Sequence, residues 1–195
     1  MKKGIDVSEN NGAVDWAAVK AAGMEFAIVR ASYGRTGVDE RLLENVEGAH
    51  AAGLLCGAYH YSYALDEQQA REEAAHCRKV IEDAGVLLEL PVFYDMEDAD
   101  GYKARHGFAF DAAEITAMCR AFLDAIGLDC GVYASLSWLE DYIDWQSLGC
   151  AVWNAQWSST DDLKGYMWQY TDHLIIGGKA FDGNILYEGN DGKGQ

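Results

Sequence analysis

The chain alternates short apolar segments with amphipathic helical patterns, and this alternation constrains its fold more than any other feature. Eight segments have the length and apolar content of buried strands, and they are centred near Ile5, Ile28, Ala58, Phe93, Val132, Val152, Trp168 and Asp182. Helical patterns separate the early strands, and this order within one domain predicts a largely parallel sheet. Eight strands of this kind favour closure into an α/β barrel.

Three helices are predicted from apolar residues at helical spacing. One covers 111–126, where Asp111 and Glu114 form a capping box ahead of an apolar stripe and a glycine ends the pattern. The other two cover 66–85, with charged residues opposite its apolar stripe, and 42–52, and each is closed by a glycine. These helices are expected to pack their apolar stripes against the outside of the barrel.

The last strands leave little room for helices between them. About ten residues separate the strand patterns at 157–167 and again at 171–181, whereas a parallel crossover with a helix needs a dozen or more. We therefore expect a barrel whose final strands lack proper helices. One barrel domain is expected over 1–188, followed by a short flexible tail over 189–195.

Charge and apolar patterning exclude several classes of protein. The chain has 32 acidic and 15 basic residues, a net charge of −17, which argues against binding nucleic acid through its phosphates. No apolar run reaches the roughly 18 residues that a membrane span requires, and the first ten residues lack the apolar core of a signal peptide. No helix has a spare apolar face, so a monomer is expected.

Cysteine and histidine spacing predicts no metal site and no cofactor. The five cysteines lack C-x-x-C spacing, and we interpret them as buried thiols, with Cys119 and Cys130 the pair to be checked for a disulfide. His60 lies within an apolar strand and is interpreted as a hydrogen-bonded core residue. A metal-dependent polysaccharide deacetylase therefore fits poorly.

Two acids interrupt the end of the apolar segment LPVFYDMEDAD. Side chains two residues apart on a strand point to the same face, so Asp95 and Glu97 are expected to project side by side, roughly 6 to 7 Å apart at the backbone. Two carboxyls this close in a dry site do not both ionise readily, so one keeps its proton to higher pH. An acid beside a carboxylate is the combination that glycoside hydrolysis requires. The structural alternative is that acids at a strand end, such as Asp98 and Asp100, cap a helix or form a turn.

Acids and aromatic residues also stand at the predicted ends of other strands, where an α/β barrel builds its active site. The acids at these ends are Asp6, Asp95, Glu97 and Asp182. The residues proposed for substrate binding are Tyr33, Tyr61, Tyr133, Gln156 and Trp157, with Tyr61 the first choice. Aromatic faces stack on pyranose rings and carboxylates bind hydroxyl groups, so this set predicts a sugar-binding cleft.

Eight ordered motifs resemble those of glycoside hydrolase family 25, the Chalaropsis-type lysozymes of bacteria, phages and fungi. The motifs are GIDVSENNGAVDW, FAIVRASYG, GAYHYSYA, LPVFYDMED, GVYAS, NAQW, MWQYT and FDGN, and the likeness runs from Gly4 to about Tyr187. The resemblance implies an irregular eight-stranded barrel with about five helices. It also implies a lysozyme that acts at the bacterial cell wall as an N-acetylmuramidase, cleaving the β-1,4 bond from N-acetylmuramic acid to N-acetylglucosamine in peptidoglycan.

By the same resemblance, Glu97 matches the general acid of the family, Asp95 its partner, and Asp6 and Asp182 the other two acids of the site. We expect burial and Asp95 to raise the pKa of Glu97, which then protonates the glycosidic oxygen. Asp95 is expected to stabilise the cationic sugar or to orient the substrate's N-acetyl group. One departure from the family is Asn11, which stands where many members have glutamine.

Two other functions stay open at this stage. One is a non-catalytic wall-binding barrel, because a barrel hydrolase can lose its chemistry and keep its sugar binding. The other is a glycosidase that acts on a different polysaccharide.

Overall fold

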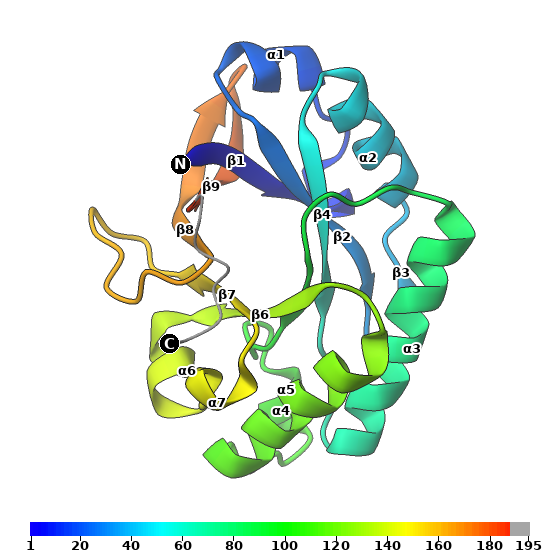
Figure 1. Ribbon diagram of the computed structural model, residues 1–195, viewed down its shortest axis with the longest axis vertical. Helices are drawn as coiled ribbons and strands as arrows, with labels where there is room; N and C mark the ends of the chain where they lie inside the picture. The colour runs from blue at the N-terminus through cyan, green and yellow to red at the C-terminus, as the bar shows by residue number, and fades with distance from the viewer. Residues whose placement is uncertain (188–195) are drawn as a thin grey trace.

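The computed structural model describes residues 1–187, and its centre is a closed barrel of eight strands (Figure 1). In chain order these strands are β1 (Lys2–Val7), β2 (Phe26–Tyr33), β4 (Leu55–Tyr61), β5 (Val92–Asp95), β6 (Cys130–Ser135), β7 (Ala151–Ala155), β8 (Met167–Ile176) and β9 (Lys179–Leu186). Pairing of β1 with both β2 and β9 closes the barrel, and the short β3 (Gly37–Val38) pairs with β2. The predicted eight-stranded α/β barrel is confirmed, whereas residue 188 and the predicted tail over 189–195 lie outside the described residues.

The final strand runs against the direction expected for it. The seven strands from β1 to β8 pair in parallel where they are neighbours, but β9 is antiparallel to both β8 and β1. A tight turn at Gly177 and Gly178 joins β8 to β9, so no crossover helix fits between them. No helix lies between β7 and β8 or between β8 and β9, as predicted. Asp182, however, lies in the middle of β9 and not at the C-terminal end of a strand, which corrects the predicted position.

Helices cover the outside of the barrel wall along much of its circumference (Figure 1). They are α1 (Trp16–Ala21), α2 (Leu42–Ala51), α3 (Glu67–Ala84), α4 (Tyr102–Arg105), α5 (Ala112–Ile126), α6 (Leu136–Asp141) and α7 (Trp145–Leu148), with a 3-10 turn η1 (Glu9–Asn11). Five of the seven have six or more residues, in line with the expected number. The three helices predicted from periodicity are α2, α3 and α5, and Asp111 caps α5 by accepting a hydrogen bond of 3.0 Å from the Glu114 N–H. Within residues 1–187, no helix combines the length and apolar character needed to cross a membrane.

Two apolar cores lie on opposite sides of the barrel wall. The outer core packs the stripes of α3 and α5 against the strands, and the inner core fills the barrel with residues such as Phe26, Phe93 and Trp153. Gly4 makes room for this inner core, because a Cβ atom there would lie 2.6 Å from the Phe26 ring. The barrel is therefore a packed core over part of its length, and polar side chains enter it only near one end.

The interpretations of cysteine and histidine agree with the structure except at Cys130, which is only partly buried. All five cysteines are thiols, so no disulfide joins Cys119 to Cys130. His60 is fully buried, and its Nδ1 atom is hydrogen-bonded to the Ser32 hydroxyl at 2.8 Å.

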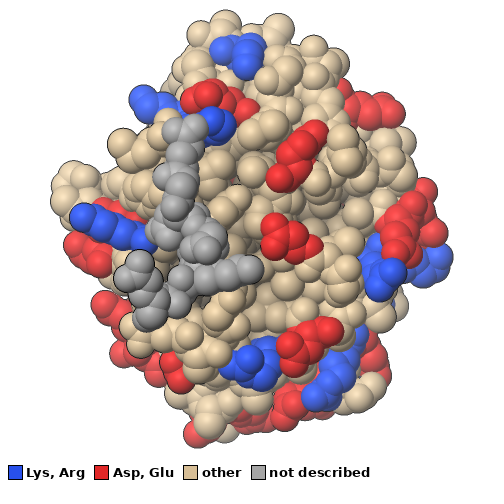
Figure 2. All heavy atoms as spheres, in the orientation of Figure 1, with Lys and Arg blue, Asp and Glu red and all other residues tan. Residues whose placement is uncertain are grey.

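Acidic side chains are spread over the face shown in Figure 2, and in several places basic side chains lie beside them. Helix α3 contributes three such pairs at helical i,i+4 spacing, Arg71 with Glu67, Arg78 with Glu82, and Lys79 with Asp83. Exposed pairs of this kind contribute little to stability. Each pair joins one acid to one base, so the net charge of the chain stays at −17.

Candidate active site

The four acids predicted for catalysis gather at the end of the barrel where the parallel strands terminate. Asp6 on β1 is the register partner of Asp182 on β9. Asp95 on β5 is flanked by Tyr61 on β4 and Tyr133 on β6. Asp6 and Asp95 interact electrostatically, as do Asp182 and Glu97, so the four acids face one another in one polar chamber above the inner core.

Asp6 is the most strongly held of the four acids. Its Oδ2 atom accepts hydrogen bonds from Asn184 Nδ2 at 2.7 Å and from Gln169 Nε2 at 3.0 Å. Asp6 also shares a hydrogen bond with Asp182. Burial raises the pKa of Asp6, while these hydrogen bonds lower it. Asp6 is therefore the acid of this pair that ionises first.

Asp182 keeps its proton well into the neutral range. Burial, followed by the negative charge of Asp6, raises the pKa of Asp182 to about 8. A protonated Asp182 can donate a hydrogen bond to the Asp6 carboxylate. Between the ionisation of Asp6 and that of Asp182, the pair carries one negative charge.

The raised pKa of Asp182 makes a prediction about stability. The folded state holds this proton to about pH 8, whereas the ordinary value for an aspartate is 3.8, so this group lowers stability as pH rises through that window. Asp182→Asn keeps a donor toward Asp6 and removes the titration. We expect the variant to exceed the wild type in free energy of unfolding by roughly 1–2 kcal/mol at pH 8, with the gain disappearing toward pH 4. Urea denaturation between pH 4 and 8 measures this difference, and parallel pH profiles for the two proteins would contradict it.

Asp95 and Glu97 lie together as predicted, but only Asp95 belongs to the strand. β5 ends at Asp95, and Glu97 follows in the segment beyond it, so the simple alternation of strand side chains does not place Glu97. Asp95 is 5% exposed, and within residues 1–187 its Oδ1 atom has no hydrogen-bond partner. Glu97 is half-buried. An unsatisfied carboxyl oxygen in a buried position is costly unless a ligand supplies the missing donor.

Burial is the main reason that this pair holds protons. It raises the pKa of Asp95 well above the ordinary range, and the charge of Glu97 raises it further. The pKa of Glu97 rises to about 7, mainly through burial, with Lys103 lowering it and Asp100 and other carboxyls raising it. The negative charges of Asp95 and Glu97 act on each other, in line with the expected cause. Near neutral pH the pair therefore retains at least one proton.

The structural alternative is correct for the two aspartates that follow. Asp98 accepts hydrogen bonds from the backbone N–H groups of Lys103 at 2.7 Å and Ala104 at 3.1 Å. Asp100 accepts one from the N–H of Tyr102 at 2.9 Å. Both side chains hold the first turn of α4, as helix-capping acids do.

A cavity of about 420 Å³ is lined by Tyr61 and by none of the four acids. Tyr33, Tyr61 and Tyr63 form its aromatic part, and Arg30 and Asp100 contribute charged groups to its lining. Tyr33 and Tyr61, both predicted to bind substrate, thus line the same groove. Burial and the charge of Glu97 raise the pKa of Tyr61, so its hydroxyl stays neutral and can donate a hydrogen bond.

The other three predicted binding residues differ in their access to solvent. Trp157 is 62% exposed, and its Nε1 donates a hydrogen bond of 3.1 Å to Gln169. Tyr133 is 9% exposed and donates a hydrogen bond of 3.0 Å to the same Gln169 oxygen, so it faces the acids from inside the barrel. The Gln156 side chain donates to Asp162 at 2.6 Å and accepts from the Asp162 N–H at 3.0 Å, and so it holds its own loop together.

Three residues of the site were not identified from the sequence. Gln169 and Asn184 hold Asp6, and Asn184 also accepts a hydrogen bond of 2.9 Å from Trp153 Nε1. Lys103 faces the Asp95 and Glu97 pair from α4. Gln169 and Asn184 occur within the motifs MWQYT and FDGN, where a polar residue on an inward strand position is the available signal.

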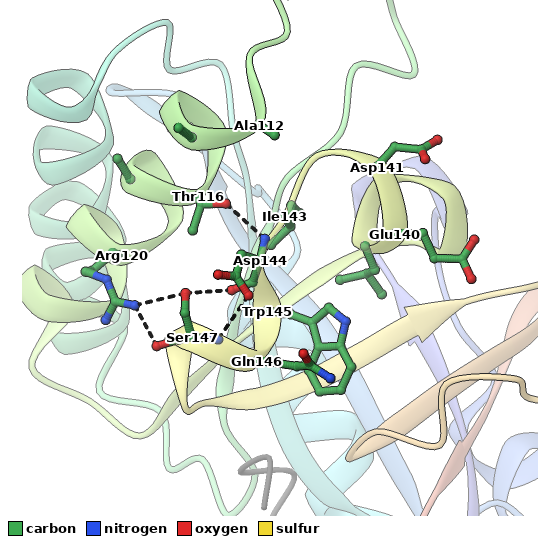
Figure 3. A pocket seen from close by; sticks show the side chains of 13 residues that line it. Ala112, Thr116, Arg120, Glu140, Asp141, Ile143, Asp144, Trp145, Gln146 and Ser147 are labelled. Carbon is green, nitrogen blue, oxygen red and sulfur yellow. Dashed lines mark hydrogen bonds between the residues drawn. The ribbon is translucent and has the colours of Figure 1, made fainter.

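A surface cavity with polar groups of its own lies apart from the four acids. A surface cavity of about 810 Å³ between α5 and the α6–α7 segment is shown in Figure 3. Its polar groups bind one another, because Thr116 Oγ1 accepts a hydrogen bond from the Asp144 N–H at 2.9 Å and Arg120 donates to the Ser147 carbonyl at 2.6 Å. These contacts fasten α7 to α5, and none of the four acids lines this cavity.

One group of possible metal ligands occurs within residues 1–187. The ligand atoms of His50, Cys56 and Glu89 lie within 4.8 Å of one another. Glu89 accepts a hydrogen bond from the Cys56 N–H at 2.9 Å and is bonded to His50 at 3.1 Å, so these contacts hold the first residues of β4. This group stands at the start of β4, away from the acids at the strand ends.

Comparisons with known proteins agree with this architecture. The family model described as Glycosyl hydrolases family 25 matches residues 5–179. An autolytic lysozyme of Clostridium acetobutylicum is 30% identical over 182 residues, which cover 90% of this chain and 52% of that protein. This chain therefore spans about half the length of that relative.

Solved structures share the fold. The CTP1L endolysin is similar with a TM-score of 0.83 and 27% identity, over 96% of this chain and 67% of that chain. The bacterial lysozyme from Streptomyces coelicolor has a TM-score of 0.77 and 23% identity, over 97% of this chain and 93% of that chain. Because the family match extends along nearly all of the barrel and its motifs, this chain belongs to the glycosyl hydrolases of family 25.

Proposed function

We propose that this chain is a lysozyme, an N-acetylmuramidase that hydrolyses the β-1,4 bond from N-acetylmuramic acid to N-acetylglucosamine in bacterial peptidoglycan. The observation that carries the proposal is the pair formed by Asp95 and Glu97, because Glu97 has a pKa of about 7 and Asp95 an unsatisfied buried oxygen. Membership of the family supports the reaction class. The chain would act as a monomer on glycan strands at the cell wall, with no cofactor, nucleic-acid partner or membrane span.

Glu97 is the general acid in this mechanism. A carboxyl group with a pKa of about 7 is half-protonated at neutral pH, and it can give its proton to the glycosidic oxygen as the bond breaks. Its half-buried position gives it contact with both the chamber and the solvent. The departing N-acetylglucosamine end then leaves as a neutral alcohol.

Asp95 responds to the positive charge that develops on the sugar. Burial keeps this carboxyl protonated in the free enzyme; as the bond breaks, its proton passes to Glu97, which gives a proton to the glycosidic oxygen, and the cationic centre then faces an ionised Asp95. Its Oδ1 atom is available to accept the N–H of the substrate's acetamido group, which would turn the acetamido oxygen toward the anomeric carbon. We place this role ahead of direct attack by Asp95, because one short segment carries both acids and they cannot easily flank the sugar from opposite faces.

Asp6 and Asp182 shape the charge of the chamber. Their shared proton leaves one negative charge that faces the sugar site from the wall opposite β5. Trp157 and Tyr61 are the aromatic surfaces that we assign to sugar rings, since both reach the solvent beside the acids. Tyr133 and Gln156 are assigned supporting roles in the wall and the loop.

The proposed acid predicts the pH dependence of catalysis. The profile of kcat/KM reports the pKa values of the free enzyme, and an acid must be protonated to act. The reacting form of the pair carries one proton, on Glu97, with Asp95 ionised, so we expect kcat/KM on soluble peptidoglycan fragments to rise about tenfold per pH unit up to roughly pH 7, where the free enzyme loses its second proton, and to level off above it. Circular dichroism over the same range checks that the fold is unchanged, and a profile that is flat below pH 7 would argue against Glu97 as the acid.

A panel of polymers separates the proposed function from its alternatives. Release of new reducing ends from peptidoglycan, with none from chitin or cellulose, is the expected outcome. Binding to peptidoglycan without release would favour a non-catalytic wall-binding barrel. Cleavage of another polymer at a higher rate would identify a different polysaccharide as the substrate.

A further inference from the structure

Lys103 is the only lysine or arginine within residues 1–187 whose side chain is withdrawn from solvent almost completely. It is 1% exposed, and it stands in the four-residue helix α4, directly behind the acids. An ammonium group in such a position is costly unless hydrogen bonds and opposite charges surround it. Both are present here.

Its hydrogen bonds join the ends of two neighbouring strands. Lys103 Nζ donates to the Ser62 carbonyl at 2.5 Å and to the Glu97 carbonyl at 2.9 Å. Ser62 follows the end of β4, and Glu97 lies just beyond the end of β5. The lysine therefore fixes the backbone of Glu97 itself against the next strand of the barrel.

The backbone of Lys103 is held in turn by the same short segment. The Lys103 N–H donates to Asp98 Oδ1 at 2.7 Å, and the Ala104 N–H donates to Asp98 Oδ2 at 3.1 Å. The segment from Glu97 to Lys103 is thus closed into a compact loop by bonds at both of its ends. A loop closed in this way limits the positions that the Glu97 carboxyl can take.

Charged and titratable groups from every neighbouring element interact with this ammonium group. They are Glu73 on α3, Asp95 on β5, Glu97 and Asp98 in the segment after β5, His60 on β4 and Cys119 on α5. Burial lowers the pKa of Lys103 from its ordinary value, and the four carboxyls among these groups oppose that shift. In return the positive charge lowers the pKa values of Asp95 and Glu97.

We propose that Lys103 is a positioning residue of the active site, whose ammonium group anchors the Glu97 backbone and supplies the positive charge behind the Asp95 and Glu97 pair. The proposal rests on the proposed function in assigning catalysis to that pair. Without this charge, the carboxyls would hold their protons to higher pH. Without the two carbonyl contacts, the Glu97 carboxyl would lose its fixed position relative to the sugar.

Other charged groups also face Glu97, and they determine its electrostatic environment once Lys103 is replaced. They are Asp100 and Asp98 on its own segment, Asp95 on β5, Asp6 on β1 and Asp182 on β9, with Tyr61 on β4 and Tyr133 on β6 as neutral neighbours. All the charged members of this set are acids. Arg30 on β2 is a cation that remains near the pair, where it lowers the pKa of Asp95. Removal of Lys103 takes away the positive charge that lowers the pKa of Glu97, so that pKa must rise.

The experiment compares Lys103→Met, Lys103→Arg and the control Lys79→Met, whose lysine side chain is 71% exposed on α3. The carboxyl carbon of Glu97 is followed by NMR titration in each protein, and kcat and KM are measured on peptidoglycan fragments across pH. We expect Lys103→Met to raise the Glu97 midpoint by about one pH unit. Its kcat should fall about tenfold or more, with KM changed less than threefold. Lys103→Arg should restore the midpoint, and Lys79→Met should match the wild type.

The NMR titration separates failure of this proposal from failure of the proposed function. An unchanged Glu97 midpoint in folded Lys103→Met would overturn the electrostatic role, whatever the activity. A shifted midpoint with no hydrolysis by the wild-type protein would leave the Lys103 effect in place and reject the muramidase assignment. If Lys103→Met folds only at acidic pH, where its carboxyls are protonated, the charge role is supported. If it does not fold at any pH, Lys103 is a residue needed for folding and the proposal fails.

Discussion

Replacement of Glu97 by glutamine is expected to abolish hydrolysis while the barrel stays folded. General acid catalysis contributes on the order of 10³-fold, equivalent to about 4 kcal/mol of barrier, and glutamine cannot supply the proton. The amide is close in shape to the carboxyl group, so substrate binding should change little. Turnover is measured as reducing ends released from purified peptidoglycan, with pull-down on the same material as the measure of binding.

The stability of Glu97→Gln gives an independent check on the same residue. Glu97 has a pKa of about 7 in the folded protein and an ordinary value of 4.5, so it lowers stability as pH rises between these values. The variant should therefore be at least as stable as the wild type at pH 7. Glu140→Gln, at an exposed position on α6, is the matched control and should retain full activity. Turnover of Glu97→Gln within tenfold of the wild type would assign the acid to another group.

Replacement of Asp95 by asparagine is the second large effect that we expect. Asparagine cannot carry the negative charge that the cationic sugar requires, and the loss of such stabilisation costs on the order of 10²–10³-fold in kcat. The substitution removes a buried carboxyl whose Oδ1 atom has no partner among residues 1–187, so the fold should be retained or stabilised. kcat and KM on soluble peptidoglycan fragments measure the effect, and the loss should fall on kcat.

The roles of the two acids can be distinguished by how the activity of each variant depends on the leaving group of the substrate. An aryl glycoside with a good leaving group needs little help from an acid, so Glu97→Gln should recover much of its activity on such a substrate, and Asp95→Asn should not. Asp124→Asn, at an exposed position on α5, is the control for the aspartate substitution. Recovery of both variants on the activated substrate would mean that Asp95 takes no part in stabilising the cationic sugar.

The barrel could be predicted from the sequence because its determinants are local. Apolar segments of strand length and the capped stripe of α5 each lie within a few consecutive residues, and the short spacings near the end correctly excluded helices there. The direction of β9 could not be read in the same way. A hairpin turn at Gly177 and Gly178 and a longer loop differ by only a few residues, and both lack a helix.

The candidate site was only partly predictable, for a related reason. Asp95 and Glu97 can be recognised from the sequence because they are acids in an apolar segment. Gln169 and Asn184 cannot, because their role is to bind Asp6, which is 163 and 178 residues away in the chain. Lys103 looks like an ordinary surface lysine in a polar segment. Its burial depends on how α4 folds back over the ends of β4 and β5, and no periodicity signals that.

The central claim is that the Asp95 and Glu97 pair cleaves the bond on the N-acetylmuramic acid side, and the identity of the new reducing end tests it most directly. Purified, de-O-acetylated peptidoglycan is digested with the wild type and with Glu97→Gln, reduced with borohydride, and analysed by mass spectrometry. We predict reduced N-acetylmuramic acid ends from the wild type and none above background from the variant. Reduced N-acetylglucosamine ends, or equal cleavage by both proteins, would contradict the proposed function.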